Sequence, residues 1–482
     1  MGQVRTRMAP SPTGEFHIGS VHTSLFNFLL ARKYQGVFVL RIDDTDRQRS
    51  KPEYVEDIKQ SLRWLGLEWD EGPEKNGPHA PYFQSQRADL YRAYWQKLID
   101  LGYAYRCFCT AEQLEQEKAQ SRAKKQAVYR YSGRCRHLTE EEIKNKLDQG
   151  LPFTIRMKTD WLEEVVVHDL IRGTVRVKAS EIGDFIIVRS DGTPVLLLTS
   201  TVDDIEMAIT HAIRGEDMLN VTFRMYFIFK ALGKDLPGYA HKPFLYATDG
   251  KKLSKRHGAT SVTEFRNQGY LPEAILNYLF MVGYTPSNPE KEFYTLDEMI
   301  QDFDFSHFQT GMPRFDYQKL NWYNKHYIKQ LPADQLAQLL LPYLQEKYPQ
   351  VNLADVQPLV PLVQQRLTTL SEIVSLAGFI FDHSSQLDYS QVKWKAAAKQ
   401  QLTAVHQQLS QLSDWQTDQL DQVFQQLIQQ HNWKVGGFFM NLRQAVAGQK
   451  ITPPITESIS LMPRQLVLDR LSAALQTLDS TS

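Results

Sequence analysis

A strand, a loop, a helix and a second strand follow one another at the beginning of the chain, and this order constrains the fold most. Residues 4–8 are typical of a short buried strand, and His17 begins a helix whose apolar residues recur at helical spacing. Gly36 ends this helix, and residues 37–42 are typical of another buried strand. Such a βαβ unit predicts an α/β fold with a parallel sheet, whose ligands bind at the carboxyl ends of the strands.

Two motifs follow these strands and are expected to meet at that edge of the sheet. Residues 10–20 read Pro-Ser-Pro-Thr-Gly-Glu-Phe-His-Ile-Gly-Ser, a tight turn that runs into the helix, and residues 43–46 read Asp-Asp-Thr-Asp. Gly14 allows a nucleotide to approach the backbone closely, and Gly19 leaves space on the first helical turn. His17 can donate to a phosphate, beside helix N–H groups that carry partial positive charge.

A cationic segment lies much later in the chain. Residues 252–256 read Lys-Leu-Ser-Lys-Arg and follow a strand-like stretch at 244–246. Lys252 and Lys255 can reach the phosphates of ATP as mobile point charges, with Mg²⁺ as counter-ion. A carboxylate that attacks the α-phosphate is already ionised, so the reaction needs positioning and charge stabilisation rather than a base. The motifs together therefore predict ATP-dependent activation of a carboxylate.

Each of these motifs also has a simpler interpretation. A cluster of Lys and Arg beside a glycine is often a solvated turn, and a histidine at a helix start is often a cap. The order of the motifs, and their position on the predicted βαβ unit, favour the functional interpretation.

Composition limits the class of protein. A chain of 482 residues predicts about three domains. The 55 basic and 55 acidic residues give zero net charge, which excludes a general polyanion binder and leaves local patches for any nucleic acid. No apolar run is long enough to span a bilayer, and the N-terminus lacks the apolar core of a signal peptide, so we expect a cytoplasmic protein with no membrane partner.

Cysteine and histidine gather in one segment. Cys107 and Cys109 form one pair, and Cys135 with His137 forms another. Four such ligands suit a closed, structural zinc site, while the alternative is three free thiols in a buried region. The three cysteines are too few and too clustered for a disulfide framework, and their position beside a histidine favours zinc.

Two other regions differ from the βαβ unit. The stretch from about 105 to 195 contains the cysteines, several arginines and alternating apolar residues, and we interpret it as an insertion into the sheet domain. Apolar strand character returns at 195–198. From about 325 the chain is rich in Gln, and its apolar residues keep a helical period, which predicts amphipathic helices with solvated Gln faces.

With these motifs the chain resembles bacterial glutamyl-tRNA synthetases of class I over essentially its full length. The resemblance rests on residues 7–14, 17–20, 41–47, 64–67, 82–87, 202–204, 213–217 and 252–256. The first helix start and the cationic loop match the family's HIGH and KMSKS motifs. The resemblance implies a Rossmann-type parallel-sheet catalytic domain in two halves, 1–105 and 196–245, with an inserted zinc-containing acceptor-binding domain at 106–195. A stem-contact domain at 246–324 and an all-α anticodon-binding region at 325–482 would follow.

The family reaction implied is ATP-dependent glutamate–tRNA ligation: glutamyl-AMP forms, and glutamate is transferred to the 3′ end of tRNA(Glu). The resemblance implies ATP, Mg²⁺ and structural Zn²⁺ as cofactors, L-glutamate and tRNA as partners, and a monomer. It assigns catalytic roles to His17, Gly19, Lys252 and Lys255. It assigns ATP binding to Thr13, Gly14, His17, Gly19 and Lys255. Zinc-containing relatives share the pattern of Cys107, Cys109, Cys135 and His137.

The amino acid would lie among Arg7, Ala9, Ser11, Asp43, Leu196 and Arg214. In the family pattern, Arg7 pairs with the side-chain carboxylate of the substrate and Arg214 holds its main-chain end. Arg366 resembles an arginine found near an anticodon base, although a surface salt bridge is an alternative role.

Three positions depart from the family pattern. Asp43 stands where Glu is usual, and Met218 where His or an aromatic residue is common. Leu196 replaces a tyrosine that hydrogen-bonds the substrate, and loss of such a donor to a charged ligand costs roughly 1.5–3 kcal/mol. These differences leave open a paralogue that activates a different or modified amino acid or charges a restricted tRNA.

A non-catalytic tRNA-binding paralogue is a further alternative, which the intact phosphate motifs disfavour. A glutaminyl enzyme, which also has Asp at the position of Asp43, is disfavoured by the helical pattern after 325.

Overall fold

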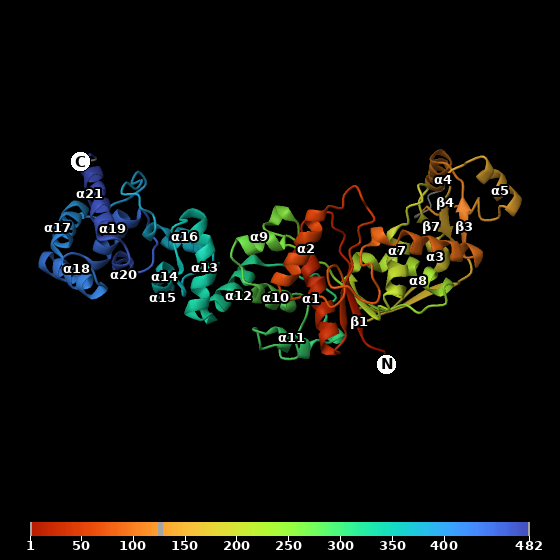
Figure 1. The fold of residues 1–482 in the computed structure, drawn as a ribbon, viewed down its shortest axis with the longest axis horizontal. Helices are drawn as coiled ribbons and strands as arrows, with labels where there is room; N and C mark the ends of the chain where they lie inside the picture. Colours follow the sequence, from red (N-terminus) through yellow and green to blue (C-terminus); the bar gives the residue numbers. More distant parts are fainter. Residues whose placement is uncertain (1, 124–128, 481–482) are drawn as a thin grey trace. The chain divides into compact units, whose positions relative to one another are not determined.

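The computed structural model describes residues 2–123 and 129–480, and these form two compact units (Figure 1). The first unit comprises residues 1–265 and 275–317, and the second comprises residues 266–274 and 318–482. No helix in the described part of the chain is both long and apolar enough to cross a bilayer.

The predicted βαβ unit is present in the first unit. Strand β1 (Arg5–Met8) pairs in parallel with β2 (Val37–Leu40), and α1 (Ile18–Lys33) connects them. Gly36 is required before β2, because a Cβ atom there would lie 2.1 Å from the carbonyl oxygen of Val4. The parallel sheet edge predicted from the sequence is therefore confirmed.

A second parallel pair completes this α/β layer. Strand β8 (His211–Gly215) pairs with β9 (Gly238–Lys242), and they are joined by η2 (Glu216–Met218) and α8 (Leu219–Ala231). Asn27 of α1 exchanges two hydrogen bonds with the backbone of Ile213, at 2.8 and 3.0 Å. Helix α1 thus covers strands that are far apart in the sequence.

The prediction of a strand at 195–198 is wrong. These residues begin helix α7 (Leu196–Glu206), whose residues 198–204 are buried. A short apolar run has the same appearance in a buried strand and a buried helix, so its periodicity could not distinguish them.

The region between β2 and α7 contains a separate antiparallel sheet. Its strands run in the order β3 (Ala104–Cys107), β4 (Thr154–Met157) and β7 (Phe185–Val188), beside a hairpin of β5 (Glu164–Asp169) and β6 (Gly173–Lys178). Its helices are α4 (Ala111–Ala123), α5 (Glu140–Asp148) and α6 (Ala179–Ile182). The alternating apolar residues of this stretch therefore form strands.

Shorter elements complete the first unit and lead into the second. Before the inserted sheet lie α2 (Pro52–Trp64), η1 (Gln84–Gln86) and α3 (Ala88–Asp100). After β9 come η3 (Lys255–His257), α9 (Val262–Asn267), α10 (Pro272–Met281), α11 (Leu296–Asp302) and η4 (Phe305–His307). Residues 266–274, which include the end of α9 and the start of α10, belong to the second unit.

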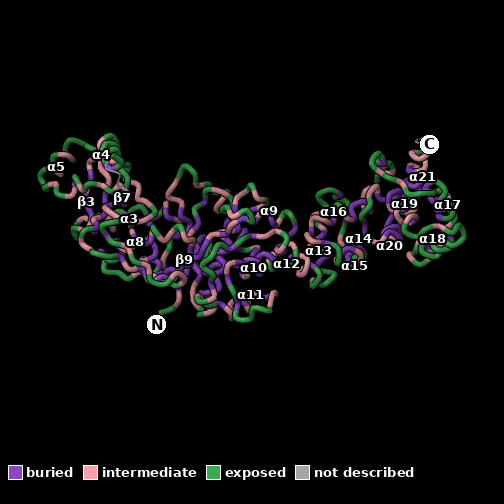
Figure 2. Tube along the Cα trace, turned by 180° about the vertical axis from the view of Figure 1, so that it is seen from behind, coloured by how far each residue is buried: buried purple, intermediate pink, exposed green. Residues whose placement is uncertain are grey.

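All the regular elements among the described residues of the second unit are helices, as predicted. Its elements are α12 (Tyr317–Gln330), α13 (Ala333–Lys347), α14 (Leu353–Val356), η5 (Gln357–Leu359), α15 (Val360–Val363), α16 (Glu372–Ala377), η6 (Gly378–Ile380), α17 (Ala398–Gln411), α18 (Thr417–His431), α19 (Val435–Ala447), α20 (Ile455–Ser460) and α21 (Arg464–Ser480). Figure 2 shows buried and exposed stretches along these helices. Leu402, Val405 and Leu409 are buried in α17 while Gln407 and Gln408 are exposed, which confirms the solvated Gln faces.

Candidate active site

The start of α1 lies against the segment that follows the cationic loop. His17 forms a β-bridge with Ser261, and the N–H of Ile18 donates to the carbonyl of Thr260 at 2.8 Å. The imidazole of His17 also caps the helix, since its Nδ1 accepts from the N–H of Gly19 at 3.0 Å. The fold therefore brings the continuation of residues 252–256 to the first motif.

The glycine of the first turn faces open space. A Cβ atom at Gly14 would have no neighbour within 4 Å, so the packing of the chain does not require glycine there. Thr13, on its exposed turn, donates its N–H to the carbonyl of Ser11 at 2.9 Å. This open turn is the kind of surface that a nucleotide could approach.

The cationic loop begins as a hairpin. Tyr246 bridges to Lys252, and the N–H of Leu253 donates to the carbonyl of Leu245 at 3.1 Å, around a turn at Gly250 with φ +79°. The Lys252 ammonium lies 3.7 Å from the centroid of the Phe244 ring. The side chain of Lys255 lies outside the described residues, so its predicted role stays a prediction.

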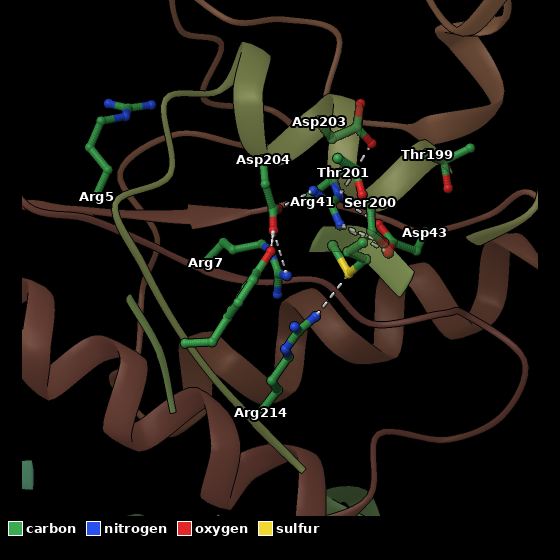
Figure 3. Close-up of polar contacts among 12 residues, drawn as sticks. Arg5, Arg7, Arg41, Asp43, Thr199, Ser200, Thr201, Asp203, Asp204 and Arg214 are labelled. Atoms are coloured by element: carbon green, nitrogen blue, oxygen red, sulfur yellow. Dashed lines mark hydrogen bonds and ion pairs between the residues drawn. The ribbon is translucent and has the colours of Figure 1, made fainter. Parts of the chain in front are cut away.

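A buried network of charges occupies the carboxyl ends of β1 and β2 (Figure 3). Arg7 binds Asp204 through two hydrogen bonds, at 2.7 and 3.0 Å. Arg41 binds Asp43 in the same manner, at 2.7 and 3.1 Å, and also reaches Asp204 at 3.0 Å. The predicted substrate residues Arg7 and Asp43 are thus each neutralised by a partner within the chain.

The adjacent carboxylates of α7 hold this network together. Asp203 accepts hydrogen bonds from Arg87, Gln84 and Tyr91. Although burial opposes ionisation, the guanidinium groups of Arg7 and Arg41 hold the pKa of Asp204 below its ordinary value. No role was predicted for these two aspartates from the sequence, although two acidic residues in an apolar segment are a signal of buried ion pairs.

Arg214, at the end of β8, is in a different state. It is buried, and none of the described carboxylates pairs with it. Its guanidinium stacks on Tyr239 at 3.7 Å and donates to the hydroxyl of Thr222 at 2.6 Å, while its Nε has no partner. Burial lowers the pKa of Arg214. An unpaired buried cation of this kind is a receptor for an anion.

The remaining predicted pocket residues are more open. Leu196 is the first residue of α7 and is 39% exposed, Ser11 is exposed, and Ala9 is half-buried. The first unit also has a cavity of about 590 Å³, lined by residues from 45–48, 85–91 and 189–194. None of the predicted site residues is among its lining residues.

The three cysteines converge in the inserted region. Cys107, Cys109 and Cys135 place their sulfur atoms within 4.8 Å of one another. A hydrogen bond from Cys135 is the main cause that lowers the pKa of Cys107, which favours a thiolate. Soft thiolate ligands in this arrangement fit zinc. The hydroxyl of Tyr131 lies 3.4 Å from the sulfur of Cys107 and 3.2 Å from that of Cys109.

His137 is not in this group of convergent ligand atoms, and its side chain is exposed. Its predicted role as the fourth zinc ligand stays a prediction.

Arg366 is an exposed residue of the second unit. It makes no ion pair with a described residue, so the surface salt bridge considered above is absent there. Its charge adds to the effect of burial in lowering the pKa of Arg443, which shows two cations close together.

Comparison with known proteins identifies the family. Residues 3–322 match the model of class I tRNA synthetases (E and Q), catalytic domain, and residues 335–475 match an anticodon binding domain. Glutamate–tRNA ligase 2 of Caldicellulosiruptor saccharolyticus is 38% identical over 97% of this chain and 98% of its own length. Glutamate–tRNA ligase of Moorella thermoacetica is also 38% identical, over 98% of both chains.

A solved structure agrees with these matches in sequence and in fold. The crystal structure of a glutamate tRNA ligase from Elizabethkingia meningosepticum, in complex with its amino acid, is 32% identical and superposes with a TM-score of 0.86. The alignment covers 99% of this chain and 100% of that one. The chain therefore belongs to the class I tRNA synthetases of the E and Q group.

Proposed function

We propose that this chain is a glutamate–tRNA ligase, which forms glutamyl-AMP from glutamate and ATP and transfers glutamate to the 3′ end of tRNA(Glu). The observation that carries the proposal is Arg214, a buried guanidinium without a carboxylate partner among the described residues, at the carboxyl end of a parallel strand. The relatives named glutamate–tRNA ligase along nearly the whole chain support it.

In this reaction Arg214 holds the side-chain carboxylate of glutamate, in place of the main-chain end that the resemblance assigns to it, and the α-carboxylate is left free to react. Because Arg7 is already paired with Asp204, Arg214 is the better candidate for this contact. The second carboxylate attacks the α-phosphate of ATP, and pyrophosphate leaves. A ribose hydroxyl at the end of tRNA then attacks the acyl carbon, and AMP leaves.

The nucleotide would lie at the start of α1. Thr13, Gly14, His17 and Gly19 form its turn, and Lys252 and Lys255 supply positive charge as the negative charge on the phosphates shifts. Mg²⁺, when bound with ATP, neutralises the phosphates.

The tRNA is expected to contact both units. We place its acceptor end against residues 106–195 and its anticodon against the helical region, where Arg366 offers an unpaired cation. The stem would lie on residues 246–324. The enzyme is proposed to act in the cytoplasm as a monomer.

Cys107, Cys109 and Cys135 are proposed to bind a structural zinc ion. The convergence of the three sulfur atoms, within 4.8 Å of one another, supports this site. Metal analysis of the purified chain is expected to find about one zinc per molecule, and the variant Cys109→Ser is expected to lose it. Zinc retained in that variant would contradict the assignment.

A second candidate is a ligase for a different or modified acidic amino acid. Leu196 favours it, because this side chain offers no hydrogen bond to a substrate where the family has a tyrosine. The test is ATP–pyrophosphate exchange with a panel of amino acids, with and without tRNA(Glu) and tRNA(Gln). Exchange with glutamate at least tenfold above every other amino acid supports the first proposal, and preference for another amino acid overturns it.

A further inference from the structure

A buried chain of hydrogen bonds leads away from the guanidinium of Arg214. Nη2 of Arg214 donates to the hydroxyl of Thr222 at 2.6 Å, and that hydroxyl lies 2.9 Å from Nε2 of His241. Nδ1 of His241 lies 2.5 Å from a carboxylate oxygen of Asp169. Thr222 and His241 are fully buried, and Asp169 is 5% exposed. We propose that Asp169, His241 and Thr222 form a relay that positions Arg214 for the substrate carboxylate.

The contact with Asp169 determines which nitrogen of His241 carries the proton. Hydrogen bonds from His241 and from backbone N–H groups lower the pKa of Asp169 in spite of burial, so its oxygen atoms accept. Burial lowers the pKa of His241, so its ring is neutral. A neutral ring that donates through Nδ1 has an acceptor at Nε2. The relay therefore presents an acceptor to Thr222.

The single proton of the Thr222 hydroxyl therefore points away from Arg214. It can be donated to Nε2 of His241 or to the carbonyl of Met218, 2.8 Å away in the same helix. In both cases the lone pair that faces Nη2 of Arg214 remains an acceptor. A neutral hydroxyl can thus orient this guanidinium without cancelling its charge, which a carboxylate would do, as Asp204 does for Arg7.

The far end of the relay is fixed by the inserted region. Asp169 is the last residue of β5, and its carboxylate also accepts the N–H groups of Ile171, Arg172 and His241 at 2.8 to 3.3 Å. Arg172 donates to the carbonyl of His241 at 3.0 Å, so the hairpin turn and β9 hold each other. The position of Arg214 consequently depends on four elements: β5, β8, β9 and α8.

This inference rests on the proposed role of Arg214 in glutamate binding, and exchange kinetics test it. The variant Thr222→Val keeps the shape of the side chain and removes the acceptor, while Thr222→Ser keeps the hydroxyl. In Thr222→Val the KM for glutamate is expected to rise about tenfold or more, because a hydrogen bond to a charged group is lost. The KM for ATP is expected to stay within about twofold, and Thr222→Ser is expected to restore the KM for glutamate.

Thr201→Val is the matched control. Thr201 is also fully buried in a helix and its hydroxyl donates to the carbonyl of Leu197 at 2.7 Å, but no hydrogen bond joins it to Arg214. It is expected to leave the KM for glutamate unchanged. An equal rise in both valine variants, or a rise in the KM for ATP as large as that for glutamate, would reduce Thr222 to a structural role and overturn the relay.

A spectroscopic measurement tests the relay separately from the proposed function. In wild-type enzyme the ¹⁵N signals of the His241 ring, assigned by their loss in His241→Gln, are expected to show a neutral ring protonated at Nδ1. A ring protonated at Nε2 would overturn the relay even if the enzyme activates glutamate. If the wild-type enzyme does not use glutamate, the proposed function fails, and the ring signals still decide whether the hydrogen-bond chain exists.

Discussion

At the scale of single residues, the buried arginines differ in whether the chain supplies them with an anion. Arg41 meets Asp43 and Asp204, and Arg7 meets Asp204, while Arg214 meets a hydroxyl and an aromatic ring. A buried charge without a partner destabilises the folded chain unless a ligand compensates it. The two kinds of arginine should therefore respond to mutation in opposite ways.

We predict that Arg41→Met destabilises the protein by about 3–5 kcal/mol, because it leaves buried carboxylates uncompensated. Arg214→Met should instead keep or raise the melting temperature while it abolishes glutamate-dependent pyrophosphate exchange. Thermal melting and exchange assays on both variants check this. Destabilisation of Arg214→Met as large as that of Arg41→Met would show that Arg214 has a structural role.

Lys242 predicts a dependence of stability on pH. Its ammonium is buried 2.9 Å from Nδ1 of His22, and burial lowers its pKa from 10.5 to about 7, against the opposing effect of Glu216 and Asp217. The unfolded chain therefore binds more protons between pH 7 and 10.5, and the free energy of unfolding rises with pH in this window.

Lys242→Met removes this contribution. The variant should melt above the wild type at pH 6, where the wild-type chain buries a charged lysine, and this advantage should shrink as the pH is raised towards 9.5. Melting curves at several pH values measure the difference. A constant difference between variant and wild type across this range would contradict the lowered pKa of Lys242.

At the scale of elements, glycines decide where segments can approach one another. Gly269 has φ +86°, and a Cβ atom there would lie 2.5 Å from the backbone nitrogens of Leu370 and Ser371. Gly66, after α2, has φ +71° with no atom within 4 Å of such a Cβ. The first glycine joins two segments of the second unit, and the second one only ends a helix.

Gly66→Ala should destabilise the protein by about 1 kcal/mol, from the left-handed backbone alone. Gly269→Ala should have the same cost from its left-handed backbone. A further destabilisation of about 1–3 kcal/mol should come from the steric conflict with the backbone at 370–371. Denaturant unfolding of the two variants compares these values. Equal destabilisation would mean that the segment at 269 relaxes freely.

At the scale of the whole molecule, the boundary between the two compact units differs from the end of the match to the catalytic-domain family. Residues 266–274 lie within the match to the catalytic domain, yet they pack in the second unit. The hydroxyl of Tyr343 donates to the carbonyl of Arg266 at 2.8 Å, and the N–H of Leu370 donates to the carbonyl of Gly269 at 3.0 Å. The segment therefore depends on residues that follow the catalytic match.

A chain that ends at residue 334 should expose this segment. We expect trypsin to cleave after Arg266 at least tenfold faster in the shortened chain than in the full chain, because the contacts that Tyr343 and Leu370 make with Arg266 and Gly269 are lost. Cleavage after Arg189, an exposed residue of the first unit, is the internal control. Equal cleavage rates after Arg266 in both chains would show that the segment is held by the first unit.

Much of the fold was predictable because its signals are local. The periodicity of apolar residues identified the βαβ unit and the helical second unit, and the motifs indicated the family. The same reasoning was wrong at 195–198, where the apolar residues lead into a helix, because a short apolar run looks alike in a buried strand and a buried helix.

By itself the sequence determined the βαβ unit at the beginning of the chain, the helical character after 325, and the class of reaction to expect. Only the tertiary structure decided which buried arginine has a carboxylate partner among the described residues. Asp204 reaches Arg7 from 197 positions away and Arg41 from 163 positions away, so no local pattern contains these pairs. Charge compensation inside a protein depends on distance in space, and the fold is what sets that distance.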